Sequence, residues 1–129
     1  MRTTTARFKR WHASPPTLTP LLTLEIAHTT GELRTGLMGR SLLPPLQGML
    51  FVFDALGYWG FWMKDTGIPL DLAWLSSAGV VQTIVQLNPY DETMRTPGNK
   101  VKYAIELPAG TFKQYDLRIG DQLVLGVTT

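Results

Sequence analysis

The clearest strand pattern in this sequence is the stretch Val101-Lys-Tyr-Ala-Ile-Glu-Leu107. Its large apolar side chains alternate with those of Lys102, Ala104 and Glu106. Successive side chains of a strand point to opposite faces, so this alternation predicts a β-strand with one buried face. Glu106 has the outward phase, and we therefore expect its carboxylate to be exposed to solvent.

Short segments before and after this strand predict further strands. They are Leu18–Ala27, Met49–Phe53, Tyr58–Lys64, Leu70–Ser76, Val80–Leu87 and Leu123–Val127, with Asp54–Gly57 and Ser77–Gly79 as the turns of two hairpins. Thr29 and Glu32 match a capping box and predict a helix over about residues 30–38, and a second short helix is expected after Pro108. Short strands at even spacing therefore predict a mainly β (α+β) protein, a small barrel-like or sandwich fold of about seven strands with two short helices.

Basic residues are concentrated at the start of the chain. The first sixteen residues contain four basic side chains and no acid, whereas the remainder carries eight basic and ten acidic side chains. Residues 1–17 show no periodic apolar pattern and end in Ser14-Pro-Pro-Thr17. We predict a flexible basic arm over 1–17, followed by a single β-rich domain over 18–129.

Cysteine usage and hydropathy limit the class of protein. The chain has no cysteine, which removes disulfides, thiolate nucleophiles and cysteine metal ligands. No apolar run approaches the ~18 residues that span a bilayer, and the N-terminal segment lacks the apolar core of a secretory signal. The expectation is a cytoplasmic protein without a transmembrane segment.

Four segments in a fixed order resemble a known family. They are Gly36-Leu-Met-Gly-Arg40, Gly48-Met-Leu-Phe-Val-Phe53, Phe61-Trp-Met-Lys-Asp-Thr66 with Pro69-Leu-Asp71, and Tyr103-Ala-Ile-Glu-Leu-Pro-Ala-Gly110 ending at Gly120-Asp121. Together they closely resemble the domain-of-unknown-function family 192 over roughly residues 22–125. The resemblance implies a compact β-rich fold with short helices and supplies no established activity.

The chain departs from the pattern of that family at several places. Asp65 stands where the family usually has asparagine, and Gly67 where it has a larger aliphatic residue. Many members carry a cysteine in the loop that spans Asn88 to Asn99 here, and many have an export signal ahead of the domain. Exported relatives are therefore a poor guide to the location of this chain.

The stretch Tyr58-Trp-Gly-Phe-Trp-Met-Lys-Asp65 is unusually rich in aromatic residues. On a strand, Trp59 and Phe61 would face one way, and Trp62 and Lys64 the other. One of these bulky faces would fill the core, and the other could line a groove, since ligand pockets are mostly apolar with few polar groups. The alternative is barrel filling on one face and packing against a loop or helix on the other.

The leading functional prediction is a non-catalytic binding module. Its groove would be formed by Trp62, Lys64, Asp65 and Asp71, with Arg40 nearby, and would hold a small polar ligand or an extended peptide. The alternative for these charges is structural, either as a Lys–Asp ion pair or with Asp71 accepting backbone amides at a turn.

An enzyme is the competing hypothesis. A metal-independent hydrolase or isomerase could use Asp65, Asp71 and Lys64 if burial moved a pKa toward neutrality. The two histidines, His12 and His28, match neither a serine triad nor a zinc site. We favour a protein without catalytic residues, and we predict no metal and no cofactor.

The basic arm gives a third hypothesis, that of a weak nucleic-acid accessory protein. Arg7, Lys9, Arg10 and Trp11 mix cations with an aromatic ring, and phosphates or an anionic surface would attract them. The alternative is a disordered extension without a partner.

Overall fold

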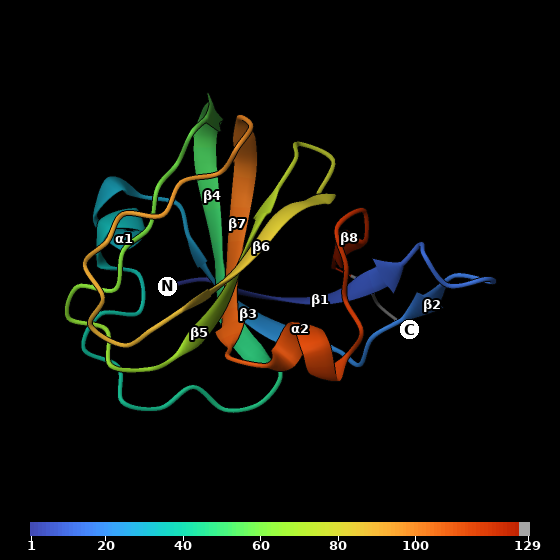
Figure 1. Ribbon diagram of the computed structural model, residues 1–129, viewed down its shortest axis with the longest axis horizontal. Coiled ribbons are helices and arrows are strands. Elements are labelled where there is room, and N and C mark those ends of the chain that lie inside the picture. The colour runs from blue at the N-terminus through green and yellow to red at the C-terminus, as the bar shows by residue number, and fades with distance from the viewer. Residues whose placement is uncertain (127–129) are drawn as a thin grey trace.

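The computed structural model describes residues 1–126 and contains one curled sheet of eight strands with two short helices (Figure 1). The elements are β1 (Thr3–Arg10), β2 (Thr17–Leu18), β3 (Leu22–Ala27), α1 (Thr30–Thr35), β4 (Gln47–Gly57), β5 (Leu70–Leu75), β6 (Val81–Leu87), β7 (Val101–Pro108), α2 (Thr111–Gln114) and β8 (Gln122–Leu125). Neighbouring strands follow the order β2-β1-β3-β4-β7-β5-β6, and β8 pairs with β1. The predicted β-rich, barrel-like fold class is confirmed, in the form of a half-barrel.

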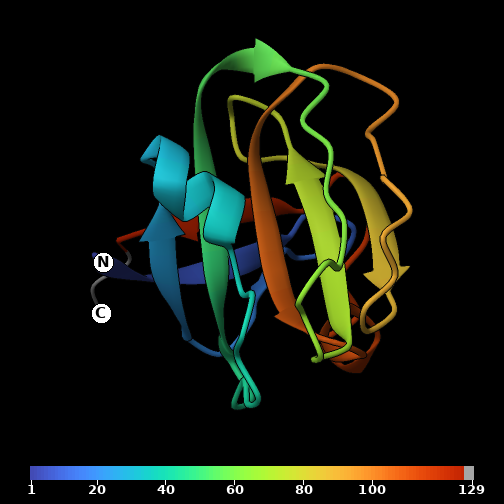
Figure 2. The ribbon, with the colours of Figure 1, turned by 90° about the vertical axis from the view of Figure 1, so that its left-hand side faces the viewer.

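The central strands β4, β7 and β5 are covered on both faces. One cluster of buried side chains includes Phe8, Ile105 and Phe112 and lies on the side of α2. The other includes Phe51 and Met63 and lies on the side of α1. Figure 2 shows α1 in front of β3 and β4, and Figure 1 shows α1 and α2 on opposite sides of the central strands. Because both faces are buried, alternation along these strands does not separate the core from solvent.

Residues 3–10 form a strand of the sheet, which corrects the prediction of a flexible arm over 1–17. β1 pairs antiparallel with β2 and β3 on one side and with β8 on the other. Ala6 and Phe8 are fully buried, and the Phe8 ring meets the edge of Phe112 at 5.7 Å between centroids. The strand was missed because only these two apolar residues mark its buried face, between polar neighbours.

Residues 58–64 are not a strand, which corrects the predicted hairpin with Met49–Phe53. β4 instead continues through the expected turn to Gly57, and it pairs parallel with β3 and antiparallel with β7. The segment after Gly57 is an irregular loop held by single contacts, in which the Phe61 and Arg95 amides each donate to the other's carbonyl at 2.8 Å. Two glycines, at 57 and 60, interrupt the run of bulky side chains that a strand requires.

Several local predictions are confirmed. The capping box is present at the start of α1, where the Thr29 hydroxyl accepts from the Glu32 amide at 3.2 Å and the Glu32 carboxylate accepts from the Thr29 amide. Ser76 closes the β5–β6 hairpin together with Gly79, which has a φ of 77°. Val127, in the predicted last strand, lies outside the described residues.

Neither helix in the described part of the chain has the length and apolar character needed to cross a bilayer.

Candidate functional site

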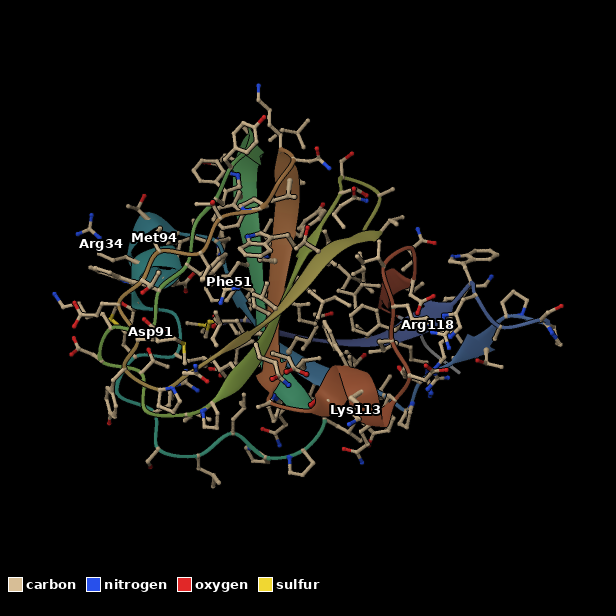
Figure 3. The ribbon with its side chains drawn as sticks, viewed as in Figure 1. Arg34, Phe51, Asp91, Met94, Lys113 and Arg118 are labelled. Atoms are coloured by element: carbon tan, nitrogen blue, oxygen red, sulfur yellow. The ribbon has the colours of Figure 1, made fainter. Side chains whose placement is uncertain are left out.

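A cavity of about 250 Å³ lies on the α1 side of the sheet. It is enclosed by α1 and the turn that follows it, by the middle of β4, by the 60–66 loop, by Met94 and by one residue of β7. The lining residues are Leu33, Arg34, Thr35, Gly36, Leu37, Met38, Phe51, Phe53, Gly60, Phe61, Trp62, Met63, Thr66, Met94 and Glu106. In Figure 3, Arg34 and Met94 lie at the outer side of the molecule and Phe51 lies deeper, toward the sheet.

Aromatic rings form much of the wall of this cavity. Phe51 and Phe61 meet at an interplanar angle of 78° with 4.8 Å between centroids, so they form two walls of a corner. Phe53 continues the wall and stacks on Trp59, whose carbonyl accepts a hydrogen bond of 2.8 Å from the indole of Trp74. These contacts fix an irregular loop against the sheet, so the rings have defined positions without a strand to hold them.

Glu106 is the only acid among the lining residues. It lies on β7 opposite Met49 of β4 and Leu72 of β5, and only 4% of its surface is exposed. Its carboxyl has no hydrogen-bond or ion-pair partner among residues 1–126, and burial alone raises its pKa to about 8. At neutral pH the folded protein therefore holds mostly the neutral acid, which can donate one hydrogen bond and accept others.

The buried position of Glu106 corrects the expectation that it is exposed. Its phase along β7 was assigned correctly, but α1 and the 60–66 loop cover that face as well. Ala104 shares the face and is fully buried, so an alanine at a presumed solvent position was the signal available in the sequence. No sequence pattern showed that a helix and a loop would meet above this acid.

Two of the predicted groove residues lie at this cavity or beside it. Trp62 lines it with 39% of its surface exposed, and the Lys64 ammonium lies 5.4 Å from the Trp62 ring centre. Asp65 is exposed in the turn that follows, where its φ is 55° and its carbonyl accepts from the Gly39 amide at 2.8 Å. Aspartate adopts this left-handed conformation more readily than most residues, which gives Asp65 a local structural role.

Asp71 and Arg40 have partners elsewhere in the molecule. Asp71 is buried on the opposite face of β5, and one carboxylate oxygen accepts from the amide of Phe112, at the start of α2, at 3.0 Å. This matches the structural alternative for Asp71 with one backbone amide as its partner, while its other carboxylate oxygen is buried without a partner among residues 1–126. Arg40 forms two hydrogen bonds to Glu25, at 2.7 and 3.0 Å, and this pairing lowers the pKa of the Glu25 carboxyl. The five predicted residues therefore do not converge on one groove.

The basic residues of β1 mostly contact the protein itself. Arg7 donates to the Thr19 carbonyl at 2.9 Å, and Arg10 donates to the Tyr115 carbonyl at 2.7 Å. The Lys9 ammonium lies 3.9 Å from the centre of the Trp11 ring. Of these contacts, that of Arg10 joins β1 to the residue that ends α2.

The fold and the cavity define a class, namely a half-barrel protein with an aromatic cavity on one face of its sheet and a single acid among the residues that line it. Within this class, the chain belongs to the domain-of-unknown-function family 192, described as "Uncharacterized ACR", whose model matches residues 15–125. The expected family membership is thereby confirmed.

Two solved structures are similar over nearly the whole chain. One is a protein of Sinorhizobium meliloti 1021 described as a "putative transcription regulator", with 31% identity and a TM-score of 0.90 over 96% of this chain and 94% of that one. The other is a protein of unknown function from Novosphingobium aromaticivorans DSM 12444, with 26% identity and a TM-score of 0.84 over 93% of this chain and 83% of that one. A search of the curated proteins found no significant match.

Proposed function

We propose that the protein is a binding module that holds a small molecule in the cavity beneath α1, with the apolar part of the ligand against the rings and one polar group at Glu106. The observation that carries this proposal is the buried, unpartnered carboxyl of Glu106 inside an aromatic cavity. A buried carboxyl without a partner costs stability, and a leucine at the same position would avoid that cost. A ligand that contacts the carboxyl gives a physical reason for its presence.

The form of the cavity favours binding over the hydrolase or isomerase hypothesis. Small-molecule sites are typically concave and aromatic, with a few polar groups that set orientation. The enzyme hypothesis uses Asp65, Asp71 and Lys64 together, and Asp71 lies on the other side of the sheet from Lys64, where it accepts from the Phe112 amide at the start of α2. We therefore propose binding without catalysis, and the small-molecule ligand takes precedence over the extended peptide because the cavity is closed on several sides.

The test is a screen of small fragments by two-dimensional NMR on isotopically labelled protein. We expect ligands of about six to twelve heavy atoms to shift the amide signals of the lining residues. Thr35 is exposed on α1 at the rim of the cavity, so Thr35→Trp places bulk at the entrance and should weaken binding by about tenfold or more. Thr30→Trp, on the same helix but away from the cavity, is the matched control.

Three results would contradict the proposal. They are a screen without any ligand for the lining residues, shifts that map to another surface, and equal binding by the wild type and Thr35→Trp. Native mass spectrometry of the purified protein gives an independent observation, since a retained ligand of low mass would be detected directly.

A second candidate function is contact with nucleic acid, because the Sinorhizobium meliloti neighbour is described in terms of transcription regulation. In this chain Lys9 and Trp11 are the residues of β1 and its turn that remain for such contact, since Arg7 and Arg10 donate to backbone carbonyls. Replacing Lys9 and Trp11 together by alanine should abolish salt-dependent binding of single-stranded DNA, and unchanged binding would refute this role. A cytoplasmic location stays a prediction from the sequence.

A further inference from the structure

We infer that the cavity beneath α1 takes a small organic cation, an alkylated ammonium group that pairs with the Glu106 carboxylate inside an aromatic enclosure. This inference rests on the proposed binding function and adds the charge class of the ligand. It is carried by the placement of one unpartnered acid among four aromatic side chains.

The surroundings of Glu106 leave one way to stabilise its ionised form. Met49 and Leu72 flank it across the sheet and carry no charge. Among all the lining residues, the only other charged group is Arg34, which is exposed on α1 at the outer side of the cavity. A cation that enters the cavity would stand beside a carboxylate at low effective dielectric, where the attraction between opposite charges is strong.

The aromatic walls discriminate between cations and anions. The faces of aromatic rings carry partial negative charge, and alkylated ammonium ions bind in aromatic enclosures through this charge. Phe51, Phe53, Phe61 and Trp62 all line the cavity, and the corner between Phe51 and Phe61 offers two surfaces at nearly a right angle. An anion would meet the same faces with repulsion and would lose its hydration in an apolar space.

The two cations near the entrance do not reverse this preference. Arg34 and Lys64 are both exposed, so water and salt screen their charges. The Lys64 ammonium lies 5.4 Å from the centre of the Trp62 ring, so one ring of the cavity wall already has an ammonium group over its face. The buried acid is screened much less and therefore dominates inside the cavity.

Binding of a cation in this cavity should depend on pH. Burial raises the pKa of Glu106 to about 8, so at neutral pH a bound cation must displace a proton from its carboxyl. For a ligand of fixed charge, affinity should rise about 50-fold between pH 6 and pH 8 and then level off. A neutral ligand would show no such increase, and an anion that accepts a hydrogen bond from the acid would show the opposite trend.

The experiment uses three probes of the same shape and different charge, namely choline, 3,3-dimethylbutan-1-ol and 3,3-dimethylbutanoate. Binding to the full chain is measured by titration calorimetry at pH 6, 7 and 8 in buffers of different ionisation enthalpy. We expect choline to bind most tightly at pH 8 and to release about 0.9 proton per site at pH 7. Glu106→Gln should abolish this release and weaken choline binding at pH 8 by about tenfold or more, with little effect on the alcohol. Glu92→Gln, at an exposed acid in the 88–99 loop, is the matched control.

The outcomes separate the two proposals. If the alcohol binds as tightly as choline at every pH, or if the anion binds best, the charge class is refuted while a small-molecule cavity remains. If none of the three probes binds, the inferred charge class is also refuted, and the fragment screen decides whether the cavity binds anything. The slope of affinity against pH is measured on the wild type, so it does not depend on how well Glu106→Gln folds.

Discussion

The buried acid predicts an unusual dependence of stability on pH. The pKa of Glu106 is about 8 in the folded protein, whereas 4.5 is the ordinary value for a glutamate. Between these values the folded state holds a proton that the unfolded state has lost, so each pH unit lowers the free energy of unfolding by about 1.4 kcal/mol. The stability that comes from the neutral acid is complete below pH 4.5 and is lost as pH rises through 8. Over the whole interval the loss is on the order of 5 kcal/mol.

Water reduces this loss, because a cavity of about 250 Å³ has room for several molecules that can solvate the carboxylate. We therefore expect a measured loss of about 2–3.5 kcal/mol between pH 5 and pH 8 that is specific to Glu106. The assay is urea unfolding of the wild type and of Glu106→Gln at several pH values. The glutamine does not titrate, so subtracting its curve removes the contribution of every other group. Parallel curves for the two proteins would refute the assignment of a raised pKa, and Glu92→Gln should retain the slope of the wild type.

Three further predictions concern the fold. Phe8→Ala removes a fully buried ring that packs on Phe112, and it should lower the free energy of unfolding by about 3–5 kcal/mol. The control Lys9→Ala should lower it by less than about 1 kcal/mol, and an equally small loss for Phe8→Ala would mean that β1 is not part of the core. Asp71→Ala leaves the Phe112 amide without its acceptor and should lower the free energy of unfolding in urea by about 1–3 kcal/mol. Asp71→Asn keeps an acceptor and should lower it less. Equal decreases for the two variants would show that this hydrogen bond is unimportant. Gly48→Ala would place a Cβ 2.2 Å from a backbone oxygen of β7, so it should lower the free energy of unfolding by at least about 2 kcal/mol or prevent folding. A melting temperature equal to that of the wild type would contradict the close packing of β4 on β7.

Local patterns in the sequence predicted much of the fold, because strand alternation and helix capping depend on residues that are close together in the sequence. The alternation in Val101–Leu107 found β7, and the Thr29–Glu32 pattern located the start of α1. The loop at 58–64 was missed for a tertiary reason. Phe61 and Met63 do pack into the molecule, but their backbone is held by Arg95 and Asp91 of another loop, which no local pattern can reveal.

The candidate site was predicted only where one segment determined it. Trp62 was found because a cluster of aromatic residues is visible in the sequence itself. Asp71 was misplaced because a charge at the edge of a buried strand can face either side, and here it faces α2. Glu106 was assigned to solvent because alternation distinguishes two faces of a strand but does not reveal what covers each of them.

The same ambiguity explains why Glu106 is informative. On an exposed face, a glutamate opposite methionine and leucine would be an ordinary surface residue. On this covered face the acid has apolar neighbours on both adjacent strands and no partner among residues 1–126, so folding moves its carboxyl from bulk water into a largely apolar cavity at a cost in stability. The substitutions Glu106→Gln and Glu106→Leu would relieve that cost at neutral pH, and we expect either variant to be more stable than the wild type at pH 8. If such a variant is more stable and has also lost choline binding, then the cost of burying Glu106 serves the ligand rather than the fold.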